Sequence, residues 1–126
     1  MEKKNLIGQI HNAMYQNIQK KGWVAPVDVF MEMDILTKQD YEKWRFGKIL
    51  VLEYVCNVNL RKLSDIMREV RAYAAKNKLK SSWTCYHGRG KNKDIILQFS
   101  KSGNEKIEYN YATHYVDSKR ITELKQ

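Results

Sequence analysis

The chain of 126 residues has one proline, two cysteines and no long hydrophobic run. No apolar stretch approaches the roughly 18 residues that a membrane-spanning helix needs, so we expect no membrane partner. The opening residues MEKKNLIGQI have a basic start but no apolar core after it, so we also expect no signal peptide. Cys56 and Cys85 lie in apolar runs and predict two reduced, buried thiols in a cytoplasmic protein, although a disulfide between them stays open.

Sequence signatures of the common enzyme chemistries are missing as well. The chain lacks G-x-x-x-x-G-K-[ST], G-x-G-x-x-G and G-x-S-x-G, so we expect no NTP hydrolysis, dinucleotide binding or α/β-hydrolase chemistry. Paired C-x-x-C and H-x-x-x-H spacings are also missing, so we predict no metal and no cofactor, although four side chains offer mixed ligands: Cys56, Cys85, His87 and His114. The acids of the first half are scattered and form no recognisable nuclease cluster: Asp28, Glu32, Asp34, Asp40 and Glu42.

What the chain does have is an uneven excess of positive charge. It carries 23 Lys and Arg residues against 14 Asp and Glu residues, a net charge of +9. Residues 1–59 are nearly balanced, with 8 cations and 7 acids, whereas residues 60–126 hold 15 cations and 7 acids. Within the segment 60–93, Asp65 and Glu69 are the only acids. This asymmetry predicts a partner that is a polyanion.

The order of predicted elements describes one α+β domain over residues 1–126. Apolar residues make up 43% of the chain, which is typical of a globular protein with one continuous core. The predicted parts are N-terminal helices (5–56), a basic helix (60–78), a β-hairpin with a C-terminal segment (82–116) and a frayed tail (117–126). A mainly helical part followed by a hairpin is an order found in winged-helix modules, so a winged-helix-like architecture is one expectation.

The hairpin is predicted from alternating side chains on both sides of a glycine-rich tip. Before the tip, Trp83 and Cys85 share one face and Tyr86 takes the other. After the tip, a second run alternates in the same way: Ile95, Leu97 and Phe99. We expect Trp44 and Trp83 in the core, whereas Tyr86 is left open between the core and stacking on exposed bases.

Two segments fit both a helix and a strand. Residues 48–56 are a short apolar run, in which periodicity does not distinguish the two. Residues 105–112 alternate as a strand does, but Asn104 followed by Glu105 is typical of a helix start. For this second segment we favour a short helix that runs into a strand near 112–116.

The basic helix and the hairpin tip are the candidate nucleic-acid-binding elements. On the helix, Arg61, Arg68 and Arg71 share a face away from the apolar stripe, and arginine donates two hydrogen bonds to phosphate or to a guanine edge. At the tip, cations would contact phosphates for position rather than base edges for sequence. The full predicted set is Arg61, Arg68, Arg71, Lys80, Arg89, Lys91 and Lys93. We therefore predict a non-enzymatic module that binds DNA or RNA.

Other interpretations stay open. The arginine face can simply be solvated, since Arg61 and Asp65 have the spacing of an ordinary helix ion pair. A protein-interaction or regulatory factor that docks on an acidic partner would show the same charge excess. A metal-independent ribonuclease would use His87 and His114, one to take the 2′-hydroxyl proton and the other to protonate the leaving oxygen, but no spacing rule links the two.

Five stretches of the chain resemble a family of small, uncharacterised bacterial proteins. They are GWVAPVDVFMEM, DYEKWRFGK, SSWTCY, LQFSKSG and YATHYV, which together span residues 22–116. The resemblance implies a bacterial or mobile-element origin, a protein in the cytoplasm, and a helix after Ser102 and Gly103. No activity is established for that family, so the resemblance implies no catalytic residue.

Overall fold

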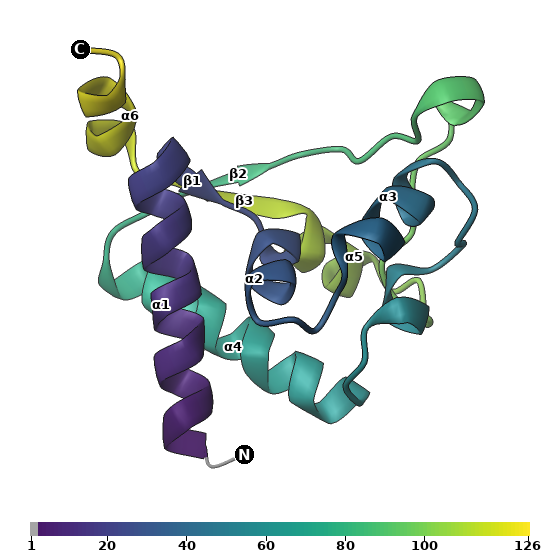
Figure 1. The fold of residues 1–126 in the computed structure, drawn as a ribbon, viewed down its shortest axis with the longest axis horizontal. Coiled ribbons are helices and arrows are strands. Elements are labelled where there is room, and N and C mark those ends of the chain that lie inside the picture. Colours follow the sequence, from purple (N-terminus) through teal and green to yellow (C-terminus); the bar gives the residue numbers. More distant parts are fainter. Residues whose placement is uncertain (1–2) are drawn as a thin grey trace.

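The computed structural model describes residues 3–126, with side chains from Asn5 onward, as helices packed around a small antiparallel sheet (Figure 1). The first half holds α1 (Lys3–Lys21), β1 (Trp23–Val24), α2 (Pro26–Glu32), α3 (Lys38–Arg45) and the short 3-10 helix η1 (Leu52–Val55). The second half holds α4 (Leu60–Lys76), β2 (Lys80–Trp83), the 3-10 helix η2 (Gly90–Asn92), α5 (Glu105–Ala112), β3 (Thr113–Val116) and α6 (Ser118–Leu124). The predicted α+β class, with a helical N-terminal part before the hairpin, is confirmed.

Helix α4 forms where its local signals place it. The Asn59 side chain accepts a hydrogen bond from the backbone N–H of Lys62 at 2.8 Å and so caps the first turn. Its apolar stripe is buried against the rest of the molecule: Leu63, Ile66, Met67, Val70 and Ala74. The helix ends at Lys76, two residues before the predicted end, and Lys78 then adopts a left-handed backbone conformation with φ of 55°.

The sheet joins strands that are far apart in the sequence. Its strand order is β1-β3-β2, so the central strand is the last one in the chain. Strand β2 pairs with β3 along its whole length, from Lys80 opposite Val116 to Trp83 opposite Thr113. The arms of the predicted hairpin meet at a single bridge between His87 and Ile96. The continuous ladder therefore lies between β2 and β3, and residues 84–112 form a long excursion between them.

The two ambiguous segments take different forms. Residues 105–112 form helix α5, capped by the Asn104 side chain, and lead directly into β3, as favoured from the sequence. Residues 48–56 form neither a long helix nor a ladder strand, but a loop with one bridge and the short helix η1. The tail that we expected to fray instead forms α6, because Asp117 caps it and the Arg120 guanidinium donates to the carbonyl of Gln19.

The core confirms one prediction about aromatic side chains, corrects another, and decides a third that was left open. Trp44 is fully buried, and its indole N–H donates to the carbonyl of Gln98 at 2.8 Å. Tyr86 is also buried and packs against Trp44 and Phe99. Trp83, expected in the core, is 53% exposed. The alternation of Trp83 and Tyr86 was predicted correctly, but the inward face was assigned to the wrong residue.

Two further features can be compared with the predictions from the sequence: the cysteine thiols and the expected absence of a membrane-spanning helix. Cys56 and Cys85 are both free, Cys56 buried and Cys85 half-buried. No helix within residues 3–126 is long and apolar enough to cross a membrane.

Candidate nucleic-acid interface

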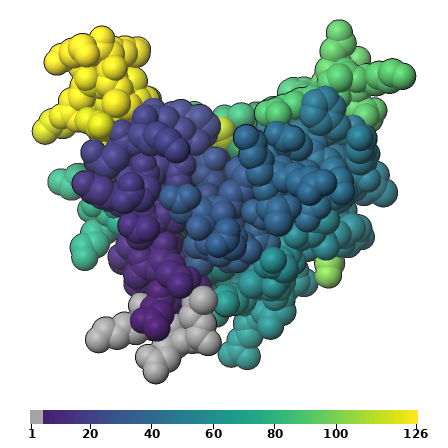
Figure 2. Space-filling model, in the orientation of Figure 1, coloured from purple at the N-terminus to yellow at the C-terminus, as the bar shows by residue number. Residues whose placement is uncertain are grey.

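The predicted cations are exposed, but they do not form one surface. Arg61, Arg68 and Arg71 lie on α4, Lys80 begins β2, and the remaining three lie at the tip: Arg89, Lys91 and Lys93. Figure 1 shows α4 along the lower side of the molecule and the tip, around η2, at the upper right. Figure 2 shows the same tip projecting from its own corner. The arginines of α4 and the cations of the tip therefore do not lie together on one surface.

The tip is a packed turn that rests on the end of α3. The backbone N–H of Arg89 donates to the carbonyl of Arg45 at 2.7 Å, and the Asn92 amide donates to the carbonyl of Phe46 at 2.8 Å. Gly88 is needed for this close approach, because a Cβ there would lie 2.3 Å from the Asn92 carbonyl oxygen. The tip cations are thus held beside α3, away from the arginines of α4.

The exposed face of α4 carries little compensating negative charge. Arg68 lies 3.4 Å from Asp65, but both side chains are well exposed, and such pairs contribute little to stability. Arg61 and Arg71 form no salt bridge within the part of the chain whose side chains are described. The predicted Arg61–Asp65 pair is therefore not formed, and the arginines remain available to a ligand.

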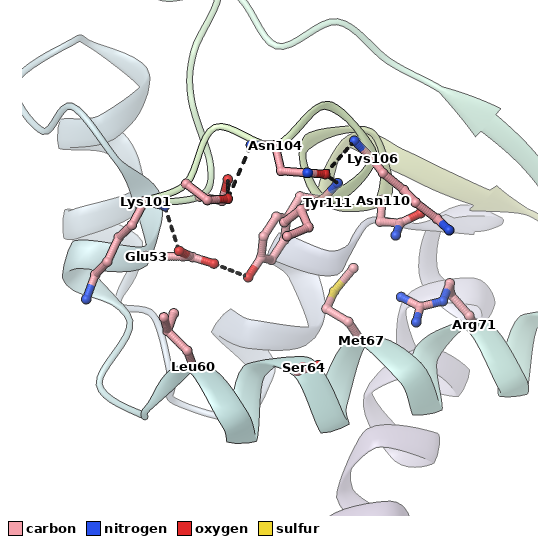
Figure 3. Close-up of a pocket in the computed structure, with 13 residues that line it drawn as sticks. Glu53, Leu60, Ser64, Met67, Arg71, Lys101, Asn104, Lys106, Asn110 and Tyr111 are labelled. Atoms are coloured by element: carbon pink, nitrogen blue, oxygen red, sulfur yellow. Dashed lines mark hydrogen bonds between the residues drawn. The ribbon is translucent and has the colours of Figure 1, made fainter.

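A groove of about 700 Å³ runs between α4, α5 and the turn at residues 100–104 (Figure 3). Its floor is apolar and comes from Met67 on α4 and Tyr111 on α5, both buried. Leu60 and Ile107 line it as well and are partly exposed, 49% and 42%. This groove lies beside the arginine face of α4, because Ser64 and Arg71 belong to both.

Three cations from three segments line the groove. Arg71 comes from α4, Lys106 from the first turn of α5, and Lys101 from the turn before it. Figure 3 shows Arg71, Lys106 and Asn110 toward one end and Lys101 beside Glu53 toward the other. None of the three cations forms a salt bridge with a described residue. Of the three, the Lys101 ammonium lies over the ring of Tyr54, 5.7 Å from its centroid.

The one acid among the described lining residues, Glu53, has both oxygens engaged. It accepts a hydrogen bond from the Tyr111 hydroxyl at 2.7 Å and another from the Lys101 backbone N–H at 2.7 Å. Burial, and then the hydrogen bond to Glu53, raise the pKa of Tyr111 well above its ordinary value, so the phenol stays protonated and donates. Glu53 thus holds the turn that carries Lys101.

Helix α5 and its preceding turn are fixed by a second carboxylate. Glu108 accepts from the backbone N–H groups of Phe99 and Ser100, at 2.9 and 2.6 Å, and from the Ser100 hydroxyl at 2.6 Å. Asn104 caps the helix by accepting from the N–H groups of Lys106 and Ile107. These contacts position Lys101 and Lys106 on opposite sides of one short turn.

The two histidines of the ribonuclease hypothesis have different surroundings. His114 stacks on Trp23, and its ring nitrogens contact the Tyr86 hydroxyl at 2.7 Å and the Thr84 hydroxyl at 3.3 Å. Burial lowers the pKa of His114 below its ordinary value of 6.5, against the attraction of Asp28. His87 is exposed near the tip, and no hydrogen bond or ring contact joins the two histidines in the described residues. The ribonuclease hypothesis therefore stays a prediction.

Metal binding has no better support. Among the described residues, no three or more His, Cys, Asp or Glu side chains group where they could hold an ion. The four mixed ligands considered from the sequence include the buried Cys56, whose pKa burial raises to about 12. A thiol that resists ionisation is a poor metal ligand.

Lys101 and Lys106 are the site residues that the sequence did not reveal. Each is a single cation in a polar turn, and neither belongs to a periodic pattern. The available signal was the helix start at Asn104, which places Lys106 in a first turn beside Lys101. Their approach to Arg71 depends on how α5 packs beside α4, which no local pattern encodes.

Comparison with known proteins gave no match: no family model, no curated protein and no solved structure matches this chain. The resemblance to small bacterial proteins therefore stays a prediction.

Proposed function

We propose that this protein binds nucleic acid in the cytoplasm through the surface formed by α4, α5 and the turn at residues 100–104. The observation that carries the proposal is the gathering of Arg71, Lys101 and Lys106 around one groove. Arg61 and Arg68 extend this surface along α4. The proposal keeps the predicted basic helix and replaces the tip with the turn before α5.

The charge and its placement support phosphate contacts. The chain has a net charge of +9, and cations with no ion-pair partner attract a polyanion and release its counterions on binding. Arginine can donate two parallel hydrogen bonds to one phosphate, and a lysine adds a mobile point charge. Neutralising a phosphate lowers the free energy of the complex most at low salt.

The test is a salt titration of binding to labelled DNA and RNA, each as a single strand and as a duplex. We expect the logarithm of affinity to fall linearly with the logarithm of salt concentration. The double variant Arg71→Ala, Lys106→Ala should weaken binding and reduce this slope by about 1.5, because each lost phosphate contact removes about 0.7 to 0.9. Both side chains are exposed, so the melting temperature should change little.

The tip offers a matched control. The double variant Arg89→Ala, Lys91→Ala removes the same net charge from exposed positions beside α3. We expect it to change affinity less than the groove variant does. The proposal is overturned if wild-type protein shows no binding at low salt. It is also overturned if the tip variant loses affinity while the groove variant does not.

A second candidate function is docking on an acidic protein partner. The apolar floor of the groove favours it, because Leu60 and Ile107 present aliphatic surface beside the cations. A nuclease-resistant complex with a stoichiometric acidic protein, lost in the variant Leu60→Ser, Ile107→Ser, would support this function over nucleic-acid binding.

A further inference from the structure

An exposed pair of aromatic rings lines a second, separate cavity on another side of α5. Trp83, at the end of β2, and Tyr109, on α5, have ring centroids 6.4 Å apart and planes within 7° of parallel. Each side chain is 53% exposed. A stacked Trp–Tyr pair with half of its surface in water presents ring faces that a flat ligand can cover.

One ring of the pair, that of Tyr109, lies near a groove cation on α5. Lys106 and Tyr109 are three residues apart on α5, which makes them neighbours on the helix surface. Arg71 and Tyr109 also both act on the buried hydroxyl of Tyr115. Burial raises the pKa of Tyr115, the Arg71 charge lowers it, and Tyr109 raises it. Lys106 and the ring of Tyr109 thus lie close together on α5.

We propose that Trp83 and Tyr109 stack on an unpaired base whose phosphates contact Arg71 and Lys106, so that the ligand is single-stranded nucleic acid. This inference rests on the proposed nucleic-acid-binding function and narrows it. In a duplex the faces of each base are covered by its neighbours, whereas in a single strand they are free to stack on protein rings.

Two acidic residues lie beside the aromatic pair and would repel a phosphate at that position. Glu105 and Glu108 line the shallow cavity beside the rings. Glu108 has its oxygens engaged by the backbone of Phe99 and Ser100, whereas Glu105 is exposed. A base, which is uncharged, suits this position better than a phosphate does. The phosphates then lie toward Lys106 and Arg71, on the groove side of α5.

The decisive experiment compares three ligands of matched length: a single strand with bases, the same strand made abasic, and a duplex. Wild-type protein should bind the single strand with bases about tenfold more tightly than the abasic strand. Trp83→Ala and Tyr109→Ala should each remove most of that difference and leave binding of the abasic strand unchanged. Trp83→Phe keeps an aromatic ring and should retain most of the affinity.

The matched control is Tyr15→Ala on α1, which removes a tyrosine that is 52% exposed and has no hydrogen bond or ring contact among the described residues. It should leave all three affinities unchanged. The inference is overturned if Trp83→Ala and Tyr109→Ala lose the same affinity for the abasic strand as for the strand with bases. That result would show that Trp83 and Tyr109 only support the fold. Equal affinity of wild-type protein for the single strand and the duplex would also overturn the inference.

Failure of the broader proposal has a different signature. If wild-type protein binds none of the three ligands at low salt, nucleic-acid binding itself is refuted and this inference with it. If the abasic strand binds and the bases add nothing, phosphate binding stands and only the inference falls. Self-association that Trp83→Ala abolishes, measured by sedimentation, would assign the aromatic pair to a protein contact instead.

Discussion

Removing the Glu108 carboxylate should destabilise the protein, because this one group holds the turn before α5. It accepts from the N–H groups of Phe99 and Ser100 and from the Ser100 hydroxyl. Ser100 is buried, only 1% exposed. In the variant Glu108→Ala, the two backbone donors and the Ser100 hydroxyl lose this acceptor at once.

The magnitude follows from those three contacts. Hydrogen bonds to a charged group contribute about 1.5–3 kcal/mol each, and a buried donor left unsatisfied costs about 1–3 kcal/mol. Since Glu108 is itself half-buried, water can reach part of the gap and offset some of the loss. We therefore expect the free energy of unfolding to fall by about 3 kcal/mol. For a domain of this size, that lowers the melting temperature by about 10 °C.

The assay is thermal unfolding followed by circular dichroism, with Glu105→Ala as the control. Glu105 lies on the same helix, is exposed, and makes no salt bridge in the described residues, so its loss should cost only the modest helix-dipole contribution. If Glu108→Ala lowers the melting temperature by less than about 3 °C, the carboxylate does not hold the turn and this reasoning fails. In a folded Glu108→Ala protein, we also expect weaker nucleic-acid binding, because Lys101 loses its fixed position.

Two further predictions concern titratable groups. Because burial lowers the pKa of His114 below 6.5, the unfolded chain takes up a proton first, and stability should fall as the pH drops through that value. The melting temperature of His114→Gln, compared with wild type at about pH 7.5 and about pH 5.5, should depend less on pH; an unchanged dependence would contradict the buried placement. With the pKa of Cys56 raised to about 12, iodoacetamide should modify Cys85 before Cys56 in the folded protein, and both in urea, as peptide mass spectrometry would show. Faster labelling of Cys56 would be inconsistent with its burial.

Short-range signals predicted the helices well. Asn104 caps α5, as its position suggested, and Asn59 and Thr37 cap α4 and α3 in the same way. Capping depends on a side chain and a backbone N–H only two or three residues away, so the sequence alone carries the information.

Strand pairing depended on contacts that the sequence does not display. The two runs around the tip were expected to form a ladder because they are close in the chain. In the structure β2 instead pairs with β3, which lies beyond α5. The wrong partner also gave Trp83 the wrong face, since alternation fixes which residues point to opposite sides but not which side is covered. Trp83 is exposed and Tyr86 is buried for that reason.

The grouping of the candidate cations depends on the same kind of long-range contact. Arg68 and Arg71 were placed correctly on the solvent side of α4, because helical periodicity determines that face. The tip was added because it follows the helix in sequence, yet it docks on the end of α3. Lys101 and Lys106 join the arginines through the packing of α5, a contact between segments that are far apart along the chain.

Helix α5 shows how a short element can be held in an ordered conformation beside the proposed binding surface. Its inner side is fixed by Tyr111, which is buried, stacks on Phe99 with centroids 5.5 Å apart, and donates to Glu53. An eight-residue helix would not hold its shape alone in water. Anchored in this way, it orients Lys106 toward the groove and Tyr109 toward Trp83 with little freedom left to lose on binding. Since the helix is already ordered in the folded protein, little conformational entropy is lost on binding. Contacts from this helix should therefore contribute more to affinity than the same residues would in a mobile loop.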